Sequence, residues 1–114
     1  MDPEYTPVEE WHGRLAVVRA AGAVDMLTAP PLLTAIRAVH GKRPAGVIVD
    51  LTDADFLASA GMQVLVIAQQ ELTPDVRFAV VADGPGTSRP LKMMGLTDFI
   101  EMFATLDAAL DTLE

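Results

Sequence analysis

The amino-acid sequence predicts an α/β fold: an open, mostly parallel or mixed sheet of about four or five strands with about four helices. Short apolar runs alternate along the chain with segments whose apolar residues recur at helical spacing. Alternating strands and helices of this length form βαβ units, which produce a largely parallel sheet. No linker divides the 114 residues, so we expect residues 1–114 to form a single domain.

The expected strands are short and rich in Val, Ile, Leu and Ala. They cover residues 15–20, 46–51, 76–81 and 99–103, with an additional strand near residues 8–11. The run GVIVDL at 46–51 is continuously apolar apart from one acid near its end. This pattern is typical of a central strand that is covered on both faces.

The expected helices follow these strands. They cover residues 28–41, 59–71, 87–94 and 105–113, and residues 52–57 are expected to form a loop. Thr28 and Thr105 stand where a helix N-cap is expected, and Pro30 and Pro31 fit a first helical turn. Gly41 then ends the first helix.

Composition argues against several function classes. The formal net charge is −8 and the eight basic residues are dispersed, which disfavours nucleic-acid binding. The chain has no cysteine, so disulfides, thiolate metal sites and cysteine nucleophiles are excluded. The N-terminus is acidic where a signal peptide is basic, and no apolar run reaches the roughly 18 residues of a membrane span. We therefore expect a soluble, cytoplasmic protein without membrane contact.

Few residues suggest catalytic or metal chemistry. Asp50, Asp53 and Asp55 cluster after the central strand, and carboxylates so grouped can bind a divalent cation. The alternative is that they are solvated turn formers. We find no phosphate-binding loop, serine elbow or histidine metal pattern, and we expect neither an enzyme nor a cofactor.

The segment from the buried strand to the second helix is the most informative part of the sequence. Ser59-Ala60-Gly61 opens that helix, and a phosphate on Ser59 would meet backbone N–H groups at the positive end of the helix dipole. Ala60 and Gly61 have little or no side chain, so a partner could approach the helix closely there. The alternative is that Ser59 serves only as the helix N-cap.

These residues carry a family resemblance. VIVDL followed by Phe56-Leu57-Ala58-Ser59-Ala60-Gly61-Met62 resembles the STAS family, which includes the bacterial anti-sigma-factor antagonists. Residues 22–25, followed by Thr28-Ala29, resemble the family's stretch before its first helix. The resemblance implies an antagonist without a cofactor, which binds an anti-sigma factor, in some systems a serine protein kinase. It thereby frees a sigma factor and regulates transcription indirectly.

The sequence departs from the family pattern at the phosphorylation site. The family's Asp-Ser-Ser-Gly reads Ala58-Ser59-Ala60-Gly61 here, so alanine stands at the usual phosphoserine position. Ser59 remains the phosphorylation candidate. We favour the interpretation that phosphorylation at the usual position is lost, which would leave the antagonist free to bind constitutively.

The resemblance also implies a partner surface formed by two loops and the start of the second helix. It comprises residues 25–28, the loop 53–58 and the exposed start of the helix at 59–63. The residues singled out within it are Asp25, Thr28, Asp53, Asp55, Phe56, Ala58, Ser59, Ala60, Gly61, Met62 and Gln63. Met62 lies off the apolar stripe, which suits either an adaptable binding surface or partial burial. We expect a monomer or weak dimer. The alternative functions are a ligand-binding or sensory STAS module of a transporter or stress-signalling complex, and an enzyme of unrecognised type.

Overall fold

The computed structural model describes residues 7–114 and contains a mixed five-stranded sheet in the order β1-β2-β4-β6-β7. Its strands are β1 (Val8–His12), β2 (Leu15–Arg19), β4 (Gly46–Asp50), β6 (Arg77–Val81) and β7 (Glu101–Phe103). β1 is antiparallel to β2, and the other neighbours are parallel. The predicted α/β class and the five strands of this sheet are confirmed.

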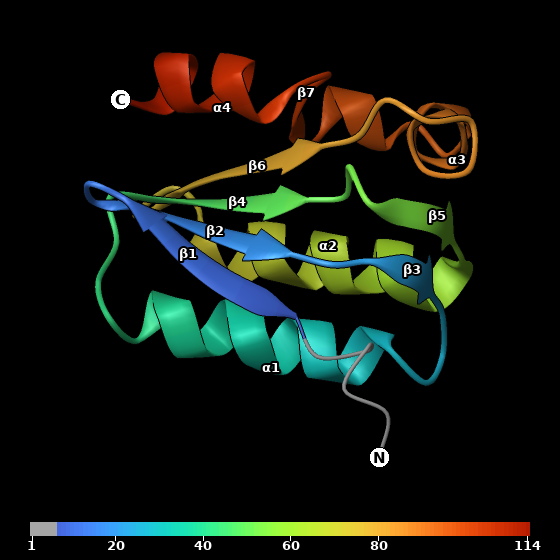
Figure 1. Cartoon of the computed structure of the whole chain (residues 1–114), viewed down its shortest axis with the longest axis horizontal. Helices are drawn as coiled ribbons and strands as arrows, with labels where there is room; N and C mark the ends of the chain where they lie inside the picture. Colours follow the sequence, from blue (N-terminus) through green and yellow to red (C-terminus); the bar gives the residue numbers. More distant parts are fainter. Residues whose placement is uncertain (1–6) are drawn as a thin grey trace.

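The helices lie on both faces of the sheet (Figure 1). They are α1 (Ala29–His40), α2 (Ser59–Leu72), α3 (Ser88–Met93) and α4 (Leu106–Leu113), with a 3-10 helix, η2 (Leu96–Asp98), after α3. α1 and α2 cover one face, and α4 lies over the other. Within residues 7–114, no helix combines the length and apolar character needed to cross a bilayer.

The core explains why β4 is apolar throughout. Every residue of β4 is buried, because helices cover both of its faces. Val47 and Val49 pack in the larger cluster with α1 and α2. Ile48 packs in the smaller cluster with Ala109 and Leu113 of α4. The central position predicted for this strand is confirmed.

The segment predicted as a loop at 52–57 contains a strand. β5 (Ala54–Leu57) pairs in parallel with β3 (Gly22–Val24) in a separate two-stranded sheet. The sequence Ala-Asp-Phe-Leu lacks a strand pattern, and the pairing partner lies far upstream, so tertiary contacts decide this element. The amide of Ala58 donates to the carbonyl of Val24 at 2.9 Å, which places the start of α2 beside β3.

The two predicted threonine caps have different outcomes. The Thr105 hydroxyl accepts from the amide of Ala108 at 3.1 Å, as predicted. Thr28 occupies the N-cap position of α1, but its side chain makes no cap hydrogen bond. An N-cap oxygen accepts from the second or third helical amide, and these positions are Pro30 and Pro31, which carry no N–H. The Thr28 hydroxyl instead donates to the carbonyl of Ala23 at 2.7 Å.

Candidate protein-binding site

The start of α2 lies at the end of the molecule where β3 and β5 finish (Figure 1). The N-cap residue is Ala58, which has an extended backbone and no side-chain oxygen to cap the helix. Ser59 is the first helical residue and is exposed. The interpretation of Ser59 as the N-cap is therefore wrong.

Gly61 does not form part of a low outer surface, as the sequence suggested. It is buried, and a Cβ added to it would stand 2.6 Å from Leu57 Cδ1 and 3.0 Å from the carbonyl oxygen of Val24. The missing side chain thus allows α2 to pack closely against β3 and β5. A Gly61→Arg substitution would disrupt this packing and is unsuitable as a surface probe.

Thr28 is the second predicted partner residue that the structure places inside. It is buried, with its hydroxyl donating to Ala23 and accepting from the amide of Asp25 at 2.9 Å. Asp25 is half-buried, and its carboxylate accepts from the amides of Leu27 and Thr28. These two hydrogen bonds lower the pKa of Asp25. Both side chains hold the turn before α1.

The remaining predicted residues divide by exposure. Ala58, Ala60 and Met62 are half-buried, and the exposed ones are Asp53, Asp55, Phe56, Ser59 and Gln63. Phe56 is 52% exposed, although it is a large apolar side chain. It lies on β5, where its neighbour Leu57 points into the core.

Two exposed apolar residues lie inside the predicted loop 25–28, of which only Asp25 and Thr28 were singled out as site residues. Met26 is 78% exposed and Leu27 is 83% exposed, in the turn between β3 and α1. We define the junction surface as the exposed residues of this end: Met26, Leu27, Asp53, Asp55, Phe56, Ser59 and Gln63.

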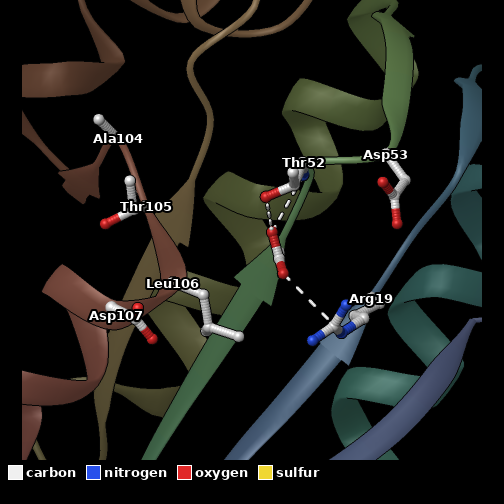
Figure 2. Close-up of a pocket in the computed structure, with 8 residues that line it drawn as sticks. Arg19, Thr52, Asp53, Ala104, Thr105, Leu106 and Asp107 are labelled. Atoms are coloured by element: carbon white, nitrogen blue, oxygen red, sulfur yellow. Dashed lines mark hydrogen bonds and ion pairs between the residues drawn. The ribbon is translucent and has the colours of Figure 1, made fainter.

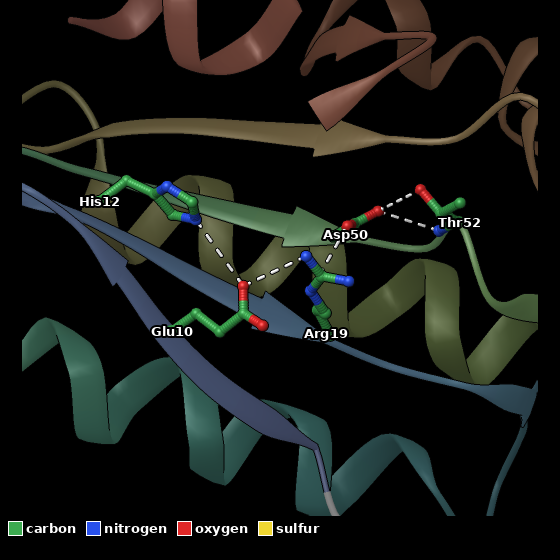
Figure 3. A network of polar contacts seen from close by, with 5 residues as sticks. All are labelled: Glu10, His12, Arg19, Asp50 and Thr52. Carbon is green, nitrogen blue, oxygen red and sulfur yellow. Dashed lines mark hydrogen bonds and ion pairs between the residues drawn. The ribbon is translucent and has the colours of Figure 1, made fainter. Parts of the chain in front are cut away.

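Asp50 has a structural environment that sets it apart from the other acids. It is 3% exposed, and its carboxylate accepts from the amide of Thr52 at 3.0 Å. Its other oxygen lies 3.9 Å from Nε of Arg19, whose Nη2 lies 3.2 Å from a carboxylate oxygen of Glu10 (Figure 3). The network joins the ends of β2 and β4 to β1, and these contacts account for the buried carboxylate of Asp50.

A shallow depression of about 270 Å³ opens above this network (Figure 2). Residues from β2, from the end of β4 and from the start of α4 line it: Arg19, Asp50, Thr52, Asp53, Ala104, Thr105, Leu106 and Asp107. Asp55 is not among them, so the structure separates it from Asp50 and Asp53. Residues 7–114 hold no group of three His, Cys, Asp or Glu side chains placed for a metal ion, and the hypothesis of a cation site at these acids has no support.

Fold and surface together define a small α/β domain that exposes apolar side chains at a strand-to-helix junction. A match to the STAS domain family covers residues 6–109, and the chain belongs to this family. It is 36% identical over 99 residues to the anti-sigma-F factor antagonist RsfB of Mycobacterium tuberculosis, covering 87% of this chain and 81% of that protein.

Solved structures agree with this membership. The crystal structure of an anti-sigma factor antagonist from Mycobacterium paratuberculosis is 37% identical, with a TM-score of 0.91, over 98% of this chain and 97% of that one. A putative anti-sigma factor antagonist from Thermotoga maritima has a TM-score of 0.86 over 98% of both chains. Its sequence is only 13% identical, so it supports the fold alone.

Proposed function

We propose that this protein is an anti-sigma-factor antagonist, which binds an anti-sigma factor through the junction surface and thereby frees a sigma factor. The carrying observation is the exposure of Met26, Leu27 and Phe56 at one end of a small domain. Exposed apolar side chains gathered in this way mark a surface that another protein covers, and aromatic side chains often anchor such contacts. The relatives named as antagonists support the same function.

Charge adds a description of the partner's surface. Asp53 and Asp55 are exposed beside Phe56, in a chain of net charge −8. Acidic groups around an apolar centre favour a partner with basic groups around its own apolar patch, and they speed encounter at low salt. The function we propose is binding in the cytoplasm, without catalysis by this chain.

The proposal also concerns phosphorylation at the position where the resemblance expects a phosphoserine. Ala60 stands where the resemblance puts the phosphoserine, and alanine cannot accept a phosphate. We propose that binding is not switched at this position. Ser59 is exposed at the start of α2 and is the remaining candidate in this segment.

The proposal is tested first by identification of the partner. The tagged chain is used to recover proteins from a lysate of its source bacterium, and mass spectrometry identifies them. An anti-sigma factor among them is then purified and titrated calorimetrically with the chain. Recovery without any anti-sigma factor contradicts the proposed function.

A matched pair of variants then tests the surface. Phe56→Ser should weaken binding to the purified anti-sigma factor by about tenfold or more, because it removes the aromatic anchor. Val8→Ser is the control, since Val8 is 54% exposed but lies on β1. Equal affinity of the two variants would contradict the assignment of the junction surface.

A further inference from the structure

α3 carries a second exposed apolar surface, which the proposed function above does not use. Met93 is 76% exposed and Met94, directly after the helix, is 65% exposed. Beside them lies a hollow of about 280 Å³ between α3 and the first turn of α2. Its lining residues are Met62, Pro85, Arg89, Pro90, Met93 and Met94. Methionine side chains are flexible and adapt to the shape of an entering apolar group.

The charge of α3 is opposite to that of the protein. Arg89 and Lys92 lie on α3, which has no acidic residue. Four of the other six cations pair with carboxylates, namely Arg19, Arg37, Lys42 and Arg77, and within the described residues Arg14 and Arg43 do not. Within residues 7–114, neither Arg89 nor Lys92 has a carboxylate in ion-pair range. A chain of net charge −8 thus leaves two cations beside an apolar hollow.

The hollow is continuous with the junction surface. Met62 lies on the first turn of α2, three residues after Ser59, and also lines the hollow. The turn before α3 is held against β5, because the amide of Leu57 donates to the carbonyl of Gly86 at 2.9 Å. A partner seated on Phe56 and the start of α2 therefore reaches the hollow without leaving the surface.

We infer that the α3 hollow is a second contact for the anti-sigma factor and receives an apolar side chain flanked by carboxylates. This inference rests on the proposed function and extends it. The combined face is acidic at Asp53 and Asp55 and basic at Arg89 and Lys92. Opposite charges at the two ends of one face fix the orientation of the partner, whose acidic segment lies over α3.

Methionine methyl groups report on the contact directly. The chain is labelled with ¹³C-methyl methionine, and spectra are recorded while the purified anti-sigma factor is added. Met26 reports on the junction surface, Met62, Met93 and Met94 report on the hollow, and Met102 of β7 is the internal reference. The inference predicts that the Met93 and Met94 signals move together with that of Met26. Movement of Met26 alone overturns it and leaves the proposed function standing.

Substitutions test the two chemical features separately. Met93→Ser together with Met94→Ser should lower affinity about tenfold, since the apolar contact is lost while the fold keeps its buried core. Arg89→Glu together with Lys92→Glu should lower it about tenfold at low salt and less at high salt. Arg14→Glu together with Arg43→Glu is the matched charge control, since both residues are exposed and the pair makes the same charge change; it should leave affinity within about twofold.

Other outcomes count against the inference. An unchanged affinity for both double variants overturns it while the complex itself confirms the proposed function. An increase in affinity with Arg89→Glu and Lys92→Glu shows a basic segment over α3 and also overturns it. If the Met93 and Met94 signals shift with protein concentration when no partner is present, the hollow binds a second copy of this chain instead. Failure to form any complex removes the proposed function, and this inference with it.

Discussion

A Cβ on Gly86 would stand 1.9 Å from the carbonyl oxygen of Asp55. The turn between β6 and α3 therefore lies directly on the backbone of β5, with no room for a side chain between them. The hydrogen bond from Leu57 to Gly86 holds the same contact. Because β5 carries Phe56 and the turn leads into α3, this contact sets the distance between the two parts of the proposed binding face.

Gly86→Ala should destabilise the protein by at least about 2 kcal/mol, because the methyl group must displace backbone rather than a flexible side chain. Equilibrium unfolding in urea measures the loss. Gly84→Ala is the control, since its Cβ would lie 3.8 Å from the nearest atom, Oγ1 of Thr87, and fits without movement. Equal stability of the two variants would show that the turn adjusts freely.

Ala58→Asp should stabilise the protein by about 1 kcal/mol, because α2 has an N-cap position without a side-chain acceptor. A carboxylate there accepts from an amide of the first turn and also interacts favourably with the helix dipole. The midpoint of urea unfolding should rise with an unchanged slope. Ala38→Asp, at an exposed position inside α1, should lower stability instead, and a gain there would point to a general charge effect.

Asp25 should contribute an acid-sensitive part of the stability. Its pKa is lowered from the ordinary value of 3.8 by hydrogen bonds from the amides of Leu27 and Thr28. Folding therefore favours the ionised carboxylate. Its contribution to stability is complete at pH values above the unfolded pKa of 3.8, and it is lost as the pH falls through the lower pKa of the folded state. The stability difference between wild type and Asp25→Asn should shrink between pH 7 and pH 2.5. Asp75→Asn, in the exposed loop before β6, serves as the control; the same shrinkage there would rule out a specific role of the Asp25 turn.

Ala60→Ser should create a phosphorylation site that the natural chain lacks. The variant and the wild type are incubated with ATP and a serine kinase that phosphorylates related antagonists, and tandem mass spectrometry locates any phosphate. Only the variant should carry phosphate in the segment 58–62, and its phosphorylated form should bind the anti-sigma factor more weakly through added negative charge. Phosphate on Ser59 of the wild type would instead show that regulation has moved by one residue.

Local patterns were sufficient to predict most elements of the fold. The apolar run at 46–51 predicted a central strand, because a strand covered on both faces needs apolar side chains at every position. Thr105 was predicted correctly as a cap, because its hydroxyl oxygen accepts from the amide of Ala108, a residue only three positions away in the sequence. β5 was missed, because its strand character comes from pairing with β3, which local pattern does not show.

The sequence predicted which segments form the candidate site, but not which of their side chains are exposed. The family resemblance placed Thr28 and Gly61 among the partner residues, whereas packing buries both. Met26 and Leu27 are exposed for the opposite reason, since the turn carries them away from the core. Exposure depends on which elements pack over a residue, so it is a property of the assembled fold.

What the sequence determined by itself is the α/β class, the order of the four helices and of the five strands of the main sheet along the chain, and the strand-to-helix junction at residues 56–62, with alanine at position 60. These follow from apolar spacing, from turn residues and from a recognisable motif. Only the tertiary structure decided that Phe56, Met26 and Leu27 share an exposed end, and that Met93 and Met94 border a hollow beside it. The physical reason is that the pairing of β3 with β5 and the packing of the Gly86 turn join segments distant in sequence, and such contacts form only when the whole chain folds.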